Sequence, residues 1–163
     1  MEDIKMNNPD NLTGQPDAAL QAARIEEKMK IESQFRSGAQ WFFWIAGLSL
    51  INTIVLFTGG NWAFIAGLGI TQVIDNIAQS LANARYIALI IDLVITGIFI
   101  LFGVYALKRS GLAFIFGMIL YGLDGLIFLV VQDWLSIAFH VFVLYFIYAG
   151  YKANKMLAQM ESA

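Results

Sequence analysis

Hydrophobic residues dominate four separate stretches of this chain, and these stretches contain very little charge. A helix needs roughly 20 predominantly apolar residues to cross the hydrocarbon core of a bilayer. Each stretch is close to that length. The pattern therefore predicts four transmembrane helices, at residues 39–58, 86–107, 111–131 and 134–151.

Only short polar turns separate the last three of these stretches. The turns are Lys108-Arg109-Ser110 and Gln132-Asp133-Trp134. Helices joined by such short loops pack as antiparallel neighbours. The predicted fold class is therefore all-α: an integral membrane protein built as a four-transmembrane-helix bundle in up-down-up-down order.

The segment between the first two stretches follows a different pattern. Its hydrophobic residues recur at helical spacing, at Ile70, Val73, Ile74, Ile77 and Leu81. Its polar residues fill the positions between them, at Thr71, Gln72, Asp75, Asn76, Gln79 and Ser80. A helix with two such distinct faces lies at an interface and does not span the bilayer. We expect an interfacial helix at residues 62–84, with a re-entrant segment as the alternative.

Polar sequences flank the hydrophobic part at both ends. Residues 1–16 are expected to form a disordered tail, and residues 156–163 a short polar tail. Residues 17–38 are predicted to form a helix with Asp17 as its N-cap. This helix either projects into the cytoplasm or lies on the inner leaflet. Residues 39–155 then make up the membrane domain.

The composition agrees with a membrane protein. The chain has 163 residues, of which 59% are hydrophobic and 13% charged, whereas soluble domains have about 45–50% apolar and about 25% charged residues. The net charge of −2 offers no basic surface for nucleic acid. The absence of cysteine excludes disulfides and thiolate metal sites. The acidic start of the chain is not followed by an apolar run, so no signal peptide is expected.

The distribution of basic residues predicts the orientation. If the N-terminus is cytoplasmic, Arg85 alone of the ten basic residues lies outside, and the other nine lie inside. Basic residues are enriched in cytoplasmic loops. We therefore expect both termini in the cytoplasm, in a bacterial inner membrane. The nine residues are Lys5, Arg24, Lys28, Lys30, Arg36, Lys108, Arg109, Lys152 and Lys155.

A polar residue interrupts each predicted span at a similar depth. Each lies about six or seven residues from the outer end of its helix, which corresponds to ~9–11 Å. Small and polar residues that share one helical stripe mark helix–helix contacts in lipid. Tyr121 and Ser136 fall on the same stripes as two of these residues. The predicted buried polar cluster consists of Asn52, Asp92, Tyr121, Asp124, Ser136 and His140.

The ionisable groups of this cluster restrict one another. A charged residue at the membrane centre costs at least ~2.5–3.5 kcal/mol, so one carboxyl is protonated or His140 is an imidazolium paired with a carboxylate. Asp92, Asp124 and His140 are also ligand types that suit a divalent metal, although no two of them share a short metal-binding motif. If the cluster only holds helices together, Asp124→Asn should be mild, because an amide still donates and accepts.

No catalytic or phosphate-binding motif accompanies the cluster, so the sequence requires no cofactor. The first hypothesis is a non-enzymatic structural or accessory subunit that packs in a larger membrane assembly. The alternative is an oligomeric proton- or ion-coupled transporter that uses Asp92, Asp124 and His140. A third is an intramembrane metal site on the same residues. The expected partners are the lipid bilayer and either a second copy or a larger membrane complex, and not nucleic acid.

Overall fold

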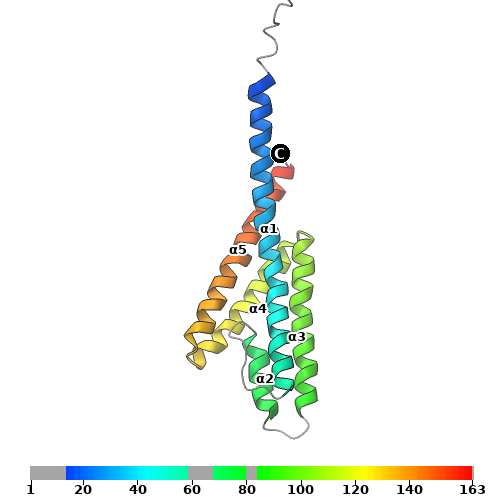
Figure 1. Ribbon diagram of the computed structural model, residues 1–163, viewed down its shortest axis with the longest axis vertical. Coiled ribbons are helices and arrows are strands. Elements are labelled where there is room, and N and C mark those ends of the chain that lie inside the picture. Colours follow the sequence, from blue (N-terminus) through cyan, green and yellow to red (C-terminus); the bar gives the residue numbers. More distant parts are fainter. Residues whose placement is uncertain (1–13, 59–67, 80–83, 163) are drawn as a thin grey trace, which may run out of the picture.

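The computed structural model of the protein describes residues 14–58, 68–79 and 84–162, and the elements in this part of the chain are all α-helices. The all-α prediction is confirmed. In chain order the helices are α1 (Gly14–Phe57), α2 (Gly69–Gln79), α3 (Ala84–Leu107), α4 (Gly111–Val130) and α5 (Trp134–Ser162) (Figure 1).

Four of the described helices are long and apolar enough to cross a bilayer, namely α1, α3, α4 and α5. The two short turns between the last three lie where the sequence predicts them, at residues 108–110 and 131–133. Helix α2 has 11 residues and is therefore only about 16 Å long, too short to span. It lies within residues 62–84, the segment predicted to be an interfacial helix or a re-entrant segment. The predicted tail at residues 1–13 and the segments 62–67 and 80–83 lie outside the described residues.

Helix α1 corrects the prediction of two separate elements at residues 17–38 and 39–58. It is one continuous helix of 44 residues that passes through Gly38 without a break. A single glycine inside a helix costs only about 1 kcal/mol, and no proline follows Pro16 to interrupt the backbone hydrogen bonds. The helix also begins at Gly14, so its first turn includes residues that were assigned to the N-terminal tail.

The four long helices form a closed ring of neighbours. Helix α1 packs on α3 and α5, and α4 packs on the same two helices. In Figure 1, α4 crosses behind α1, while α3 and α5 flank α1 on either side. Helix α2 contacts α1, α3 and α4. It lies at the end of the bundle where α1 ends, which we call the α2 end (Figure 1).

Both short turns use the same backbone device, the Schellman motif. In the first, Ser110 N–H donates to the Tyr105 carbonyl (3.1 Å), and Arg109 adopts φ 69°. In the second, Asp133 N–H donates to the Phe128 carbonyl (3.0 Å), and Gln132 adopts φ 56°. A left-handed residue at this position closes the preceding helix. The next residue, Ser110 or Asp133, then caps the following helix with its side chain.

Helices α1 and α5 cross backbone to backbone at a pair of glycines. A Cβ atom added to Gly38 would lie 2.5 Å from Cα of Gly150, and one added to Gly150 would lie 2.6 Å from Cα of Gly38. Small residues let helices approach closely where the surrounding lipid provides no hydrophobic driving force. This crossing therefore accepts no other residue without separating the two helices.

Helix α5 extends beyond the predicted span of residues 134–151 and stays helical to Ser162, which corrects the predicted polar tail at residues 156–163. The extension is held by packing, since Leu157 is buried. Arg109, in the α3–α4 turn, binds Glu161 at 2.6 Å and lies 5.2 Å from the ring centre of Phe35 on α1. The end of the bundle opposite α2 is thus tied together through one arginine.

We expect Gly150→Ala to destabilise the bundle by about 1–3 kcal/mol, the usual cost of overpacking. The matched control is Gly47→Ala, because a Cβ there meets nothing within 4 Å. The control should be neutral or stabilising by up to about 1 kcal/mol, since alanine is the better helix former. Thermal unfolding of both variants in one detergent tests this. Equal midpoints for the two variants would contradict the close crossing.

Candidate functional site

Helix α2 begins inside the protein without a capping side chain of its own. The residue before it is Leu68, which is fully buried and has no polar side-chain atom. The first N–H groups of a helix have no partner within the helix. Leaving such a group unpaired in the interior costs about 1–3 kcal/mol. An acceptor from another part of the chain therefore has to meet this helix start.

Asp124 of α4 supplies that acceptor. Its Oδ2 accepts a hydrogen bond from Gly69 N–H at 2.7 Å, and its Oδ1 accepts one from Ile70 N–H at 2.9 Å. A carboxylate is favoured at this place because the N-terminal end of a helix carries partial positive charge. Asp124, only 6% exposed, thus acts as the N-cap of a helix 54 residues earlier in the chain.

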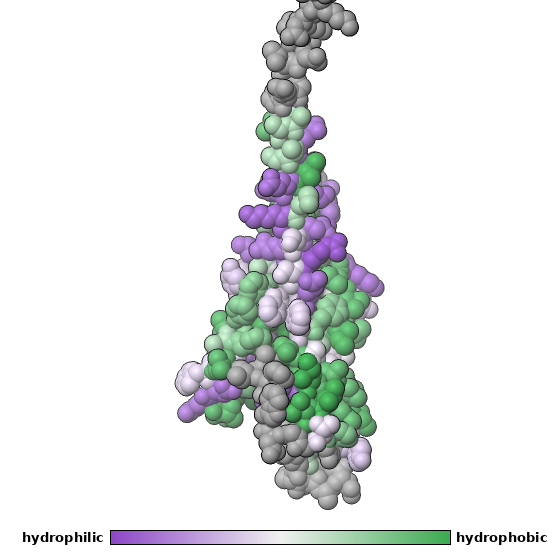
Figure 2. Space-filling view, in the orientation of Figure 1, coloured by the Kyte–Doolittle hydropathy of each residue, from purple (hydrophilic) through white to green (hydrophobic). Residues whose placement is uncertain are grey.

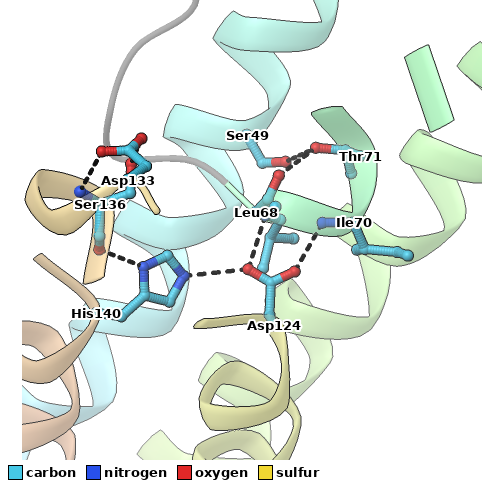
Figure 3. A network of polar contacts seen from close by, with 9 residues as sticks. Ser49, Leu68, Ile70, Thr71, Asp124, Asp133, Ser136 and His140 are labelled. Carbon is cyan, nitrogen blue, oxygen red and sulfur yellow. Dashed lines mark hydrogen bonds and ion pairs between the residues drawn. The ribbon is translucent and has the colours of Figure 1, made fainter. Parts of the chain in front are cut away.

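His140 of α5 completes the set of donors around Asp124. Its Nε2 lies 3.1 Å from Oδ2 of Asp124, and its Nδ1 lies 2.8 Å from the Ser136 carbonyl oxygen (Figure 3). The histidine is fully enclosed, with 2% of its surface exposed. One imidazole therefore links α5 to α4, and through Asp124 to α2.

The positions of the protons in this pair follow from the partners. A carbonyl oxygen only accepts, so Nδ1 of His140 must carry a hydrogen. The contact between Nε2 and Oδ2 then needs one more hydrogen, on either atom. In both cases His140 and Asp124 together are electrically neutral.

Aromatic rings enclose His140. Tyr121 stacks on the imidazole with ring centres 4.3 Å apart and an angle of 16° between the planes. Phe128 approaches at 5.1 Å. A stacked aromatic face stabilises a cationic ring. Gly125 leaves the space that the imidazole fills, since a Cβ there would lie 3.1 Å from Cδ2 of His140.

The polar contacts continue on both sides of this pair, as Figure 3 shows. On the α5 side, Asp133 accepts from the Ser136 hydroxyl (2.6 Å) and from its backbone N–H (3.2 Å). These two hydrogen bonds lower the pKa of Asp133 below its usual range. On the other side, Thr71 donates to the Leu68 carbonyl at 2.8 Å and lies 3.3 Å from the Ser49 hydroxyl. The network therefore reaches from α5 through α4 and α2 to α1.

Asp92 of α3 has different partners. Its Oδ2 accepts a hydrogen bond from the Thr53 hydroxyl at 3.2 Å. The carboxyl group of Asp75 on α2 lies close enough to interact with it electrostatically. Burial raises the pKa of Asp75 above its usual range, and the contact with Asp92 partly offsets this.

The residues of the predicted polar cluster are all buried: Asn52, Asp92, Tyr121, Asp124, Ser136 and His140. Four of them meet around the imidazole, on α4 and α5, whereas Asp92 meets Thr53 and Asp75. Within the described part of the chain, no three acidic or histidine side chains come together to hold a metal ion. The metal hypothesis for Asp92, Asp124 and His140 therefore finds no support in this geometry.

Asp124 also borders an apolar groove between α3 and α4. The groove has a volume of about 340 Å³, and aspartate is its only charged lining residue in the described chain. The Asp124 carboxylate is already hydrogen-bonded to Gly69, Ile70 and His140. It therefore adds one polar group to an otherwise apolar groove wall. The remaining lining residues are Leu68, Ile70, Ile95, Ile98, Phe99, Leu120, Leu123 and Ile127.

The depth of each residue along its predicted span did not reveal two partners of these carboxylates. The start of α2 is the partner of Asp124, and Asp75 is the neighbour of Asp92. A signal for the first was present in the sequence. Leu68 occupies the N-cap position, where Ser, Thr, Asp or Asn is preferred, so a cap from elsewhere was to be expected. Comparisons with protein-family models, curated proteins and solved structures give no match to this chain.

The structure changes the expected effect of Asp124→Asn. An asparagine replaces one of the two carboxylate oxygens by an NH₂ donor, which in the same rotamer would face either Gly69 N–H or Ile70 N–H and leave it without an acceptor. We expect a loss of about 1–3 kcal/mol instead of a mild effect, together with faster hydrogen exchange of the α2 amides. Asp17→Asn, on the exposed start of α1, is the matched control. Unchanged exchange of residues 69–79 in Asp124→Asn would disprove the capping role.

Proposed function

We propose that the protein is a non-catalytic subunit of a larger membrane assembly, in which the bundle anchors a projecting helix that binds a partner chain. The observation that carries this proposal is the free N-terminal part of α1. Every residue from 17 to 30 is exposed. At 1.5 Å per residue this segment extends about 21 Å past the last buried residues of the bundle. We call it the projecting segment.

The projecting segment carries apolar side chains that face away from the bundle. Ile25 is 61% exposed and Met29 is 67% exposed. They lie on one face with Ala22, at spacings of three and four residues. A second helix packed along this face would cover them. Figure 2 shows that the surface around this part of the molecule is mainly hydrophilic, unlike the hydrophobic surface of the bundle.

The base of the projecting segment is rigidly held, which suits a docking element. Ile31 and Phe35 are buried directly below it, and Gly38 is in backbone contact with α5. Since α1 continues straight into the bundle, the segment does not bend onto a membrane surface. This favours projection into solvent over the alternative of a helix lying on the inner leaflet.

The contacts of Asp124 and His140 favour a structural role over the alternative of a proton- or ion-coupled transporter on Asp92, Asp124 and His140. Both nitrogens of His140 are engaged, and Asp124 accepts three hydrogen bonds. A group that carries protons or performs catalysis needs access to a donor or a substrate. His140 is 2% exposed and covered by aromatic rings, and Asp124 is 6% exposed, at the wall of the apolar groove.

The proposal places α1, α3, α4 and α5 across a bacterial inner membrane, with both termini and the projecting segment in the cytoplasm. It rests on the excess of basic residues at one end of the bundle. Lys108 and Arg109 lie in the turn near that end. The turn at residues 131–133, on the opposite side, contains no lysine or arginine.

Single cysteines test this orientation cleanly, because the chain has none. We expect Val131→Cys, at a position that is 64% exposed, to react with a membrane-impermeant maleimide in intact cells. Lys108→Cys, in the other turn, should react only after the membrane is permeabilised. Labelling of Lys108→Cys in intact cells would reverse the proposed topology.

Docking on the projecting segment is tested by charge insertion. The double variant I25E/M29E should lose its partner chain during purification in mild detergent and run at a smaller mass in light scattering. The control is A23E/Q34E, which adds the same charge at exposed positions on the far side of α1. Both variants should keep the unfolding midpoint of the parent, because neither touches the bundle core.

The composition of the complex then identifies the partner. A second protein in the complex, lost only from I25E/M29E, supports an accessory subunit. A complex that contains this chain alone, and that falls apart in the same variant, identifies the partner as a second copy. Equal mass for the parent and I25E/M29E would refute docking on this face.

A further inference from the structure

The neighbourhood of Asp92 consists of oxygen atoms from three helices. Asp92 on α3 is 1% exposed, Thr53 on α1 donates to it, and the carboxyl of the partly buried Asp75 on α2 is its electrostatic neighbour. The described partners of Asp92 are therefore a hydroxyl and a second carboxyl, and neither carries positive charge. Asp124 differs in this respect, because it meets an imidazole and two N–H groups.

Two buried side-chain oxygen atoms at this place are free to accept a hydrogen bond or to bind a ligand. Oδ1 of Asp92 and Oγ1 of Thr96 have no hydrogen-bond partner within the described chain. Thr96 is 4% exposed and lies one turn from Asp92 on the same buried face of α3. A buried polar atom without a partner is costly. Its presence next to a carboxyl pair points to something that binds there.

The surrounding backbone adds further negative potential. Thr53 lies four residues before the end of α1 at Phe57, and Asp75 lies four residues before the end of α2 at Gln79. The C-terminal ends of helices carry partial negative charge and favour cations. Two carboxyls gain no electrostatic stabilisation from lying near two such helix ends. Carbonyls at helix ends together with side-chain oxygens are a known setting for monovalent cations in membrane proteins.

We propose that Asp75, Asp92, Thr53 and Thr96 form a binding site for a monovalent cation of the size of Na⁺. The cation lies between the two carboxyls, and the hydroxyl oxygens complete its coordination. A divalent ion fits less well, because no third acidic or histidine side chain of the described residues joins the two carboxyls to balance its charge. This site is independent of the docking surface on α1.

Binding of Na⁺ to the full chain in detergent tests the proposal. A ligand that binds only the folded state raises the unfolding midpoint in a saturable way. We expect NaCl to do so relative to choline chloride at equal ionic strength. Asp92→Asn should abolish the effect. Thr96→Val, which keeps the shape and removes one oxygen, should weaken binding about tenfold, as expected for one lost ligand contact.

Matched controls separate the site from general salt effects. Thr58→Val and Asp133→Asn make the same chemical changes outside the site, and both should keep the response to Na⁺. If Asp92→Asn fails to fold, equilibrium dialysis of the parent chain and Thr96→Val with radioactive sodium decides the question. An equal response to choline, an unchanged sodium affinity in Thr96→Val, or the absence of saturable sodium binding would overturn the proposal.

Discussion

The structure depends on a single carboxylate that meets the start of a helix. Asp124 accepts hydrogen bonds from Gly69 and Ile70, at the first turn of α2, and from the imidazole of His140. Without it, two backbone N–H groups and Nε2 of His140 would remain unpaired inside the protein, each at a cost of about 1–3 kcal/mol. Because Asp124 and His140 are neutral together, the pair can lie within a hydrocarbon-facing bundle. One side chain thus fixes the positions of α2, α4 and α5 relative to one another.

The opposite end of the bundle is fixed by shape. In lipid, helices gain little from burying apolar surface against each other, so close packing and hydrogen bonds determine which faces meet. The contact between Gly38 and Gly150 brings α1 and α5 together with no side chain between them. Arg109 then joins the α3–α4 turn to both of these helices. A polar network at one end and a close crossing at the other define the ring of four helices between them.

The sequence predicts the helices more fully than it predicts their contacts. Apolar length located the four long helices and both turns, because these are properties of local stretches. The common depth of Asp92, Asp124 and His140 along their predicted spans correctly suggested that they are buried. Depth could not show that Asp92 lies apart from the other two, since the rotation of each helix about its own axis also decides which side chains meet. The contact between Gly38 and Gly150 could not be predicted for the same reason, because the rotation of α1 and α5 decides which of their residues meet.

Helix α2 explains why two carboxyls at the same depth have opposite surroundings. Its positive N-terminal end points at Asp124, which is consequently well satisfied as an anion. Its negative C-terminal half carries Asp75 to Asp92, where the end of α1 adds to the same potential. A short helix across the end of the bundle therefore creates a place for an anion at its start and a place for a cation near its end. The first is occupied by the protein's own carboxylate. The second has no cationic side chain of the described chain in it, and this asymmetry of one helix dipole is the physical reason to look for an ion there.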